Sequence, residues 1–215
     1  MKFVKRSTAL ALLIAASLPA LQGCFPVVAT GVGAAAVATV DRRTYGTLVT
    51  DAEIERNAVD RIEHNYGKNT HVDVISYNRV VLLSGQAPSA EAKADIERLV
   101  SGVPNLRSIL NEIQVGPAGS FGDRSNDAYI TSKVKARFVD AGKFYPNHVK
   151  VATEAATVFL MGIVTRKEAD DAVEIARTTS GVRKVVRAFE YVGEDQAKQL
   201  DSRPPENPAP ATNKQ

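Results

Sequence analysis

Apolar residues recur at every fourth position in two separate parts of the chain. The positions concerned are Ile54, Ala58 and Ile62 in the first part and Ile130, Val134 and Phe138 in the second. Residues with this spacing lie on one face of an α-helix, so each part is predicted to form a helix with one buried stripe. Asp51 and Asp127 precede the stripes, and we expect their carboxylates to cap the two helices.

Short apolar or alternating stretches follow each predicted helix and are typical of strands. The predicted strands are 72–76 and 80–83 in the first part, and 149–153 and 158–160 in the second, with turns near 77–78 and 155–156. A second helix is predicted over 89–100 and over 166–178, each followed by a glycine at which helices commonly end, Gly102 or Gly181. A last strand is predicted over 109–115 and over 185–191.

The two parts therefore share the order helix–strand–strand–helix–strand, and individual residues also correspond. The matched pairs are Asp51 and Asp127, His71 and His148, Gly85 and Gly162, and Gly102 and Gly181, with an offset that grows only from 76 to 79 residues. A repeat of this kind predicts an α+β protein built from two copies of one unit. At about 65 residues a unit is near the lower limit for an independent core, so two copies would gain stability by packing together.

Residues 1–23 have the anatomy of a secretory signal peptide. A basic start precedes an apolar run over 9–21 that is too short to span a bilayer as a mature helix. The junction Leu-Gln-Gly-Cys at 21–24 resembles the cleavage box of bacterial lipoproteins, which implies a diacylglycerol and an N-acyl chain such as palmitate on Cys24. A plain signal peptide with a chance cysteine is the alternative, but Cys24 is the only cysteine. In many bacterial lipoproteins an aspartate after the lipidated cysteine retains the protein in the inner membrane. This chain has Phe25 at that position, so the resemblance implies that the protein is sorted to the outer membrane.

Residues 24–50 are expected to form a lipid-anchored tether. Gly31 and Gly33 fit a loose dinucleotide-binding fingerprint, and Asp51 lies 20 residues beyond Gly31. Such a site needs a strand before the glycines and a long helix after them, whereas charged residues at 41–43 interrupt the place of that helix. We therefore expect no nucleotide, no metal and no other cofactor besides the acyl chains on Cys24.

Charge and composition argue against nucleic-acid binding. The net charge is +3, but three of the 27 basic residues lie in the signal peptide, and without it 24 basic residues match 24 acidic ones. Aromatic residues make up 6% of the chain and Trp is absent, which disfavours stacking on bases. The copies differ in sign, with a net charge of −3 over 51–115 and +3 over 126–192, so we expect them to have different roles.

Catalytic chemistry is not indicated. His71 and His148 occupy equivalent positions in the repeat and are expected to share a structural role at strand entry. The acidic residues of the second helices are expected to be exposed to solvent, which makes them poor acid–base pairs. These residues are Glu91, Asp95 and Glu97 in the first copy and Glu168, Asp170, Asp171 and Glu174 in the second. We expect no enzyme activity and no small-molecule substrate.

The first helix of the second copy has a distinctive set of side chains. Lys133, Lys135 and Arg137 accompany Tyr129 and Phe138 there. An aromatic residue beside several cations is typical of a helix on a membrane surface. An ordinary solvent-exposed helix face with one tyrosine is the alternative, and composition alone favours it.

The repeated unit resembles the BON domain of bacterial envelope proteins. The features that carry the resemblance are an apolar strand ending in glycine (VVLLSG and VFLMG), the helix after it, and a Gly-Val turn before the last strand. The resemblance implies that each copy has a small three-stranded mixed sheet packed by two helices. A lipoprotein box followed by two such copies is similar to the dual-BON outer-membrane lipoproteins.

Those lipoproteins are non-enzymatic, face the periplasm, and support outer-membrane integrity and cell division. The resemblance implies that the first helix of the second copy binds anionic phospholipid such as phosphatidylglycerol or cardiolipin. The residues expected to bind it are Tyr129, Lys133, Val134, Lys135, Arg137 and Phe138. Two alternatives remain: a module whose acidic first copy binds an envelope protein, and an osmotic- or envelope-stress protein with holdase-like action.

The chain is thus expected to divide into five segments. They are a signal peptide (1–23), a tether (24–50), a first BON domain (51–116), a second BON domain (126–193) and a tail (194–215). The tail ends in the sequence RPPENPAPATNKQ, which is polar and rich in proline. Segments of that composition cannot bury enough apolar surface to fold, so we expect the tail to be disordered.

Overall fold

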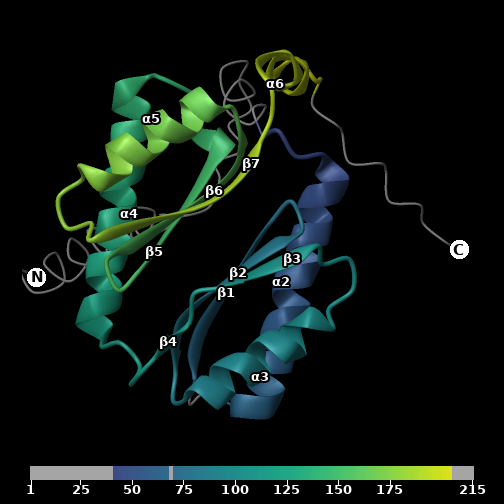
Figure 1. Cartoon of the computed structure of the whole chain (residues 1–215), viewed down its shortest axis with the longest axis vertical. Helices are drawn as coiled ribbons and strands as arrows, with labels where there is room; N and C mark the ends of the chain where they lie inside the picture. Colours follow the sequence, from purple (N-terminus) through teal and green to yellow (C-terminus); the bar gives the residue numbers. More distant parts are fainter. Residues whose placement is uncertain (1–40, 68–69, 205–215) are drawn as a thin grey trace, which may run out of the picture. The chain divides into compact units, whose positions relative to one another are not determined.

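A computed structural model describes residues 41–67 and 70–204 (Figure 1). The elements of the first half are α2 (Tyr45–Tyr66), β1 (His71–Tyr77), β2 (Val80–Ala87), α3 (Ala90–Ser101), β3 (Ser108–Asn111) and β4 (Gln114–Val115). Those of the second half are α4 (Phe121–Ala141), the 3-10 turn η3 (Pro146–His148), β5 (Val149–Glu154), β6 (Thr157–Val164), α5 (Arg166–Arg177), β7 (Lys184–Tyr191) and α6 (Glu194–Asp201). The signal peptide, Cys24 and the tether up to residue 40 lie outside the described residues and stay predictions.

Each half is an αββαβ unit with a small mixed sheet, as predicted. In the first unit the central strand β2 is antiparallel to β1 and parallel to β3 and β4. In the second unit the central strand β6 is antiparallel to β5 and parallel to β7. The strand predicted over 109–115 is divided, because Ile113 buries its side chain in the core and its N–H donates to the side chain of Asn111 at 3.2 Å.

The predicted apolar stripes form the cores between helices and sheets. The stripe of α2 packs with residues of β2 and α3, and the stripe of α4 with residues of β6 and α5. Helices α2 and α3 therefore cover one face of the first sheet, and α4 and α5 cover one face of the second (Figure 1). Hydroxyl groups of Ser89 and Thr165 cap α3 and α5 close to the predicted positions.

The other faces of the two sheets pack against each other in a third core. Its buried members are Tyr77 and Leu82 from the first unit and Phe159, Met161 and Ile163 from the second. Alternate residues of a strand point to opposite faces, so a strand between helices and a second sheet is buried on both sides. Accordingly, seven of the eight residues of β2 and all eight of β6 are buried. Each large apolar side chain removed from water contributes about 2 kcal/mol to this contact.

The two opening helices begin earlier than predicted. α2 extends back to an N-cap at Thr44, and α4 to an N-cap at Ser120. The prediction that Asp51 and Asp127 cap these helices was wrong, because both residues lie inside a helix on its buried face. Their carboxylates have a different task, which the sequence pattern did not reveal.

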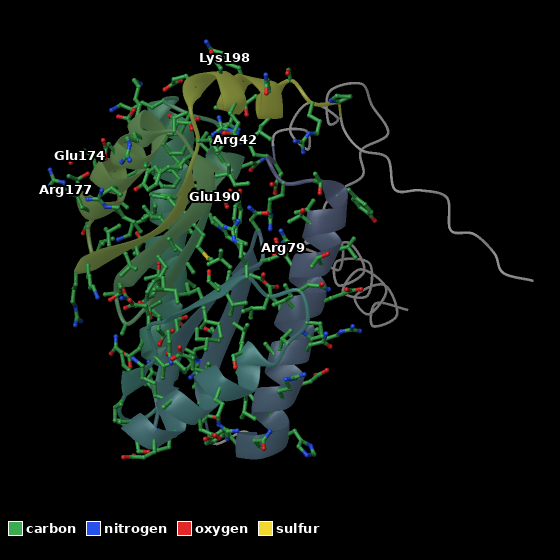
Figure 2. The ribbon with its side chains drawn as sticks, turned by 45° about the vertical axis from the view of Figure 1, so that its right-hand side comes forward. Arg42, Arg79, Glu174, Arg177, Glu190 and Lys198 are labelled. Atoms are coloured by element: carbon green, nitrogen blue, oxygen red, sulfur yellow. The ribbon has the colours of Figure 1, made fainter. Side chains whose placement is uncertain are left out.

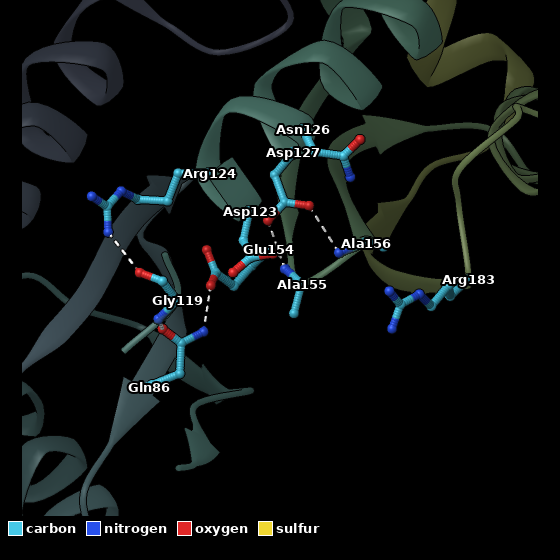
Figure 3. Close-up of a pocket in the computed structure, with 10 residues that line it drawn as sticks. All are labelled: Gln86, Gly119, Asp123, Arg124, Asn126, Asp127, Glu154, Ala155, Ala156 and Arg183. Carbon is cyan, nitrogen blue, oxygen red and sulfur yellow. Dashed lines mark hydrogen bonds between the residues drawn. The ribbon is translucent and has the colours of Figure 1, made fainter. Parts of the chain in front are cut away.

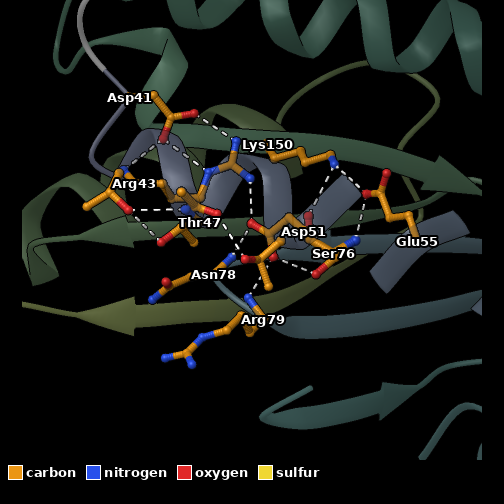
Figure 4. Close-up of polar contacts among 12 residues, drawn as sticks. Asp41, Arg43, Thr47, Asp51, Glu55, Ser76, Asn78, Arg79 and Lys150 are labelled. Atoms are coloured by element: carbon orange, nitrogen blue, oxygen red, sulfur yellow. Dashed lines mark hydrogen bonds and ion pairs between the residues drawn. The ribbon is translucent and has the colours of Figure 1, made fainter. Parts of the chain in front are cut away.

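Each of these buried aspartates holds the turn between the first two strands of its unit. The Asp51 carboxylate accepts from the backbone N–H groups of Asn78 and Arg79 (Figure 4), and the Asp127 carboxylate from those of Ala155 and Ala156 (Figure 3). The four bonds are 2.7–2.9 Å long. All four turn residues have positive φ angles between 48° and 65°, which non-glycine residues rarely adopt. Two-residue hairpins normally form this turn with Asn-Gly, so here the aspartates supply the stabilisation.

Glycine ends the matched apolar run in each unit because a neighbouring backbone comes too close for a side chain. A Cβ on Gly85 would collide with the carbonyl oxygen of His71, and one on Gly162 with that of His148. The two histidines therefore share a backbone role at strand entry. Their side chains differ, since that of His148 is fully buried and that of His71 is half-buried.

Two predictions about the flanking segments were wrong in part. Residues 41–50, assigned to the tether, include the buried Arg42 and the first turns of α2. Residues 194–201, assigned to a disordered tail, form α6. An ion-pair cluster between Arg42 and Asp201 fixes both segments, and no local pattern in the sequence announces such a long-range contact.

Replacing Asp127 by alanine is expected to destabilise the protein by about 2 kcal/mol, because two largely buried N–H groups lose their acceptor. Asp140→Ala, an exposed change on the same helix, is the control and should cost less than about 0.5 kcal/mol. Ala155→Asn with Ala156→Gly should recover part of the loss, since Asn-Gly adopts this turn readily. Urea unfolding measures all three; equal stability of the Asp127 and Asp140 variants would contradict the assigned role.

Candidate functional site

Helix α4 carries three of the eight large apolar side chains that are exposed in the described part of the chain. Phe121 is 79% exposed, Tyr129 61% and Val139 64%. Phe121 and Val139 are separated by 18 residues, about five helical turns, so they lie on one line along the helix. Phe121 and Val139 were not among the predicted site residues, although this spacing could have revealed them.

Two lysines accompany these side chains. Lys135 is exposed, and no hydrogen bond or ion pair engages its ammonium within the described residues. The Lys133 ammonium lies 4.5 Å from the centre of the Tyr129 ring and donates to the carbonyl oxygen of Ser180 at 2.5 Å. A cation over a tyrosine ring is attracted to its π-face, so the pair is held together at the surface. We call Phe121, Tyr129, Lys133, Lys135 and Val139 the exposed face of α4.

The structure corrects the predicted phospholipid-binding set. Val134 and Phe138 are 0% and 1% exposed and belong to the core of the second unit, so they cannot contact a lipid. Arg137 is half-buried, and its guanidinium donates to the carbonyl oxygen of Ile175 and the hydroxyl of Thr179, both at 2.8 Å. Tyr129, Lys133 and Lys135 therefore remain from the predicted set.

A second polar cluster joins distant parts of the chain around Arg42, a residue that Figure 2 labels close to α6. All five N–H groups of its buried guanidinium donate hydrogen bonds of 2.7–3.0 Å. Two go to the carboxylate of Glu168, two to the carboxylate of Asp201 and one to the carbonyl oxygen of Ile163. His148 lies between the same carboxylates, with Nδ1 3.2 Å from Glu168 and Nε2 3.3 Å from Asp201. This Arg42 cluster ties the segment before α2 to the second unit and to α6.

Glu168 was predicted to be solvent-exposed, and this was wrong. Besides contacting Arg42 and His148, it forms a capping box with Thr165 at the start of α5. Burial alone raises the pKa of Glu168, but hydrogen bonds from His148 and Arg42 outweigh burial and hold that pKa well below its ordinary value of 4.5. The carboxylate is therefore ionised and serves structure rather than acid–base chemistry.

The described residues give little support for other kinds of site. Residues 41–67 and 70–204 contain no group of three or more His, Cys, Asp or Glu arranged to hold a metal ion. Within the same ranges, none of the helices combines the length and the apolar character needed to traverse a bilayer. His148 is enclosed in the Arg42 cluster, while His64 is exposed on α2 and His71 opens β1. The exposed face of α4 is the candidate functional site.

Comparison with known proteins gives consistent matches. The BON domain matches residues 50–117 and 126–193. The chain is 37% identical to outer membrane lipoprotein DolP of Haemophilus influenzae, over 85% of this chain and 95% of that protein. It is 35% identical to the 21 kDa hemolysin of Actinobacillus pleuropneumoniae, over 71% and 80% of the two chains. It is 30% identical to osmotically-inducible protein Y of Escherichia coli, over 58% and 63%.

Arg42→Ala is expected to lower the free energy of unfolding by about 3 kcal/mol at neutral pH, because buried carboxylates lose their main partner. Arg56→Ala, an exposed arginine on α2, is the matched control and should change it by less than about 0.5 kcal/mol. Urea unfolding measures both. A loss no larger than that of the control would contradict a stabilising role for the Arg42 cluster.

The same cluster predicts a pH dependence. The pKa of Glu168 is lower in the folded protein than in the unfolded chain, where it is about 4.5. This difference stabilises the fold fully at a pH above the unfolded pKa, so the wild type should lose stability as the pH falls below about 4.5. Arg42→Ala weakens the cause of this shift, and its stability should fall less steeply from about pH 5 to about pH 3. Parallel urea-midpoint curves for wild type and variant over that range would contradict the prediction.

Proposed function

Because this chain belongs to the BON domain family, we propose that it is a non-enzymatic lipoprotein of the bacterial outer membrane that binds anionic phospholipid through α4. Acyl chains on Cys24 anchor the protein, and the two BON units face the periplasm. There it supports the integrity of the membrane. The lipids concerned are phosphatidylglycerol or cardiolipin.

The observation that carries this proposal is the composition of the exposed face of α4. Three apolar side chains lie open to solvent there together with an exposed lysine, which makes no ion pair within the described residues, and a lysine held over a tyrosine ring. Amphipathic side chains of this kind place their apolar parts in the interface of a bilayer and their charges at the headgroups. The exposed carboxylates of α4, Asp123 and Asp140, lie near its two ends and leave the middle of the helix cationic.

The expected binding free energies indicate that α4 orients the protein on the membrane rather than holding it there. Each basic residue near an anionic surface contributes about 1 kcal/mol, so Lys133 and Lys135 contribute about 2 kcal/mol. An acyl chain contributes about 0.8 kcal/mol for each buried methylene, which gives a multi-chain anchor a far larger share. The anchor keeps the protein at the membrane, and α4 decides which surface of the second unit faces the lipids.

The relatives support an envelope location. DolP of Haemophilus influenzae is an outer membrane lipoprotein by name, and the likeness extends over 95% of that protein. The lipoprotein box at Cys24 and the aromatic residue at Tyr129 are the features of this sequence that the family resemblance associates with anchoring and lipid contact. Phe121 and Val139 add to the apolar surface that Tyr129 presents on α4.

The test is a triple variant, Tyr129→Ser with Lys133→Gln and Lys135→Gln. Its affinity for phosphatidylglycerol in neutral detergent micelles, measured by calorimetry on the full chain, should fall at least tenfold, since a loss of about 2 kcal/mol corresponds to about thirtyfold. A matched variant on the first unit, Val49→Ser with Arg56→Gln and Lys93→Gln, should bind as the wild type does. Equal affinity of the two triple variants, both with wild-type melting temperatures, would remove α4 from the proposal.

A second candidate function is protection during osmotic or envelope stress. It is favoured by the 30% identity to osmotically-inducible protein Y. Holdase-like action would appear as suppressed aggregation of an unfolded client in the absence of lipid. If the triple variant of Tyr129, Lys133 and Lys135 suppresses aggregation as fully as the wild type does, the two functions reside on different surfaces.

A further inference from the structure

A cavity of about 190 Å³, lined mostly by polar and charged residues, lies where the two units and the segment between them meet (Figure 3). Its walls come from the end of β2, the residues before α4, the first turns of α4, and the turn between β5 and β6. At roughly 30 Å³ for each water molecule, the volume corresponds to about six waters. A small polar molecule with about ten non-hydrogen atoms fits a space of this size.

One wall of the cavity is a buried carboxylate that forms no ion pair with any cationic side chain in residues 41–67 and 70–204. Glu154 is 7% exposed, and one of its oxygens accepts a hydrogen bond of 2.5 Å from the amide of Gln86, which is 8% exposed. Gln86 is itself fixed, because its oxygen accepts the N–H of Gly119 at 2.9 Å. Burial, with the nearby charges of Asp73 and Asp127, raises the pKa of Glu154. An uncompensated buried carboxylate is costly, so this one is suited to a positively charged ligand.

Cationic side chains occupy other parts of the wall. Arg124 donates one N–H to the carbonyl oxygen of Gly119 at 2.9 Å, and Arg183 makes no ion pair within the described residues. Figure 3 shows Arg124 and Arg183 on opposite sides of the cavity, with Glu154 between them. Guanidinium groups present planar arrays of N–H donors that suit phosphate oxygens. The cavity therefore offers places for both signs of charge.

We propose that this cavity binds a small zwitterion that carries a primary ammonium and a phosphate, as phosphoethanolamine does. The ammonium donates to the Glu154 oxygen that Gln86 leaves free, and the phosphate accepts from Arg183, because the Arg124 guanidinium already donates to Gly119. A primary ammonium has three N–H donors, whereas a trimethylammonium group has none and is larger. The site therefore prefers phosphoethanolamine to phosphocholine. The ligand is either the free molecule or the headgroup of a phospholipid at the membrane surface.

The first experiment titrates O-phosphoethanolamine and phosphocholine into the full chain in neutral detergent micelles. Calorimetry should give an affinity for phosphoethanolamine at least tenfold higher than for phosphocholine. Glu154→Gln and Arg183→Gln should each weaken the binding at least tenfold. Glu174→Gln, at an exposed position on α5, is the control and should leave it unchanged. Absence of phosphoethanolamine binding to the wild type, or unchanged binding by Glu154→Gln, overturns the proposal.

Stability separates a ligand site from a structural role for Glu154. Removing an unpaired buried charge while keeping the amide hydrogen bond should leave the melting temperature of Glu154→Gln equal to or above that of the wild type. A lower melting temperature together with unchanged phosphoethanolamine affinity would show that Glu154 is structural and would overturn the site.

The source of the ligand is distinguished by competition. If the headgroup is the ligand, micelles doped with phosphatidylethanolamine should displace free phosphoethanolamine from the wild type; if the free molecule is the ligand, they should not. The triple variant of Tyr129, Lys133 and Lys135 should still bind free phosphoethanolamine at full affinity. That result separates this cavity from the phospholipid-binding role of α4, because either can fail without the other.

Discussion

Each sheet has one face that its own helices do not cover, and the apolar side chains on these two faces meet in one core. The remaining structure depends on this contact. Tyr77 and Leu82 pack there with Phe159, Met161 and Ile163, and Leu200 of α6 adds to the edge. Among the described residues, α2 and α3 cover only the opposite face of the first sheet and α4 and α5 only that of the second, so each unit needs the other to keep this face from water. This constraint explains why two copies fold as one body and leaves α4 free on the outside to meet another surface.

Ion pairs between the units support their contact. These pairs account for part of the difference in net charge between the acidic first unit and the basic second unit. Lys150 of the second unit lies 3.0 Å from Glu55 of the first, and Lys184 lies 3.6 Å from Glu112 (Figure 4 shows the Lys150 pair). In a third contact the second unit supplies the carboxylate instead of the cation, because Glu190 accepts hydrogen bonds from Asn78 and Arg107 of the first unit. Such partly exposed pairs contribute about 0–1 kcal/mol each, so they set the register of a contact that apolar burial drives.

The repeat, the order of elements and the buried stripes could be predicted because local periodicity and composition determine them. The apolar runs at 80–83 and 158–160 predicted strands, and the structure adds that these strands are buried on both faces. The roles of Asp51 and Asp127 could not be predicted, since an aspartate before an apolar stripe looks like a helix cap until the distant turn that it holds is known. Arg42 was missed for the same reason: its partners lie more than 100 residues away. At the candidate site, composition and the family resemblance pointed to Tyr129, Lys133 and Lys135, whereas Val134 and Phe138 belonged to the stripe already assigned to the core.

The central claim is that the exposed face of α4 is where this two-unit body meets the membrane. The most direct measurement records amide signals of the lipid-anchored full chain in bilayer discs that contain phosphatidylglycerol with a spin-labelled headgroup. Paramagnetic broadening is expected to be strongest around Phe121, Tyr129, Lys135 and Val139 and weak on α2, α3 and α5. Broadening that is strongest on the helices of the first unit, or spread evenly over both units, would contradict the account.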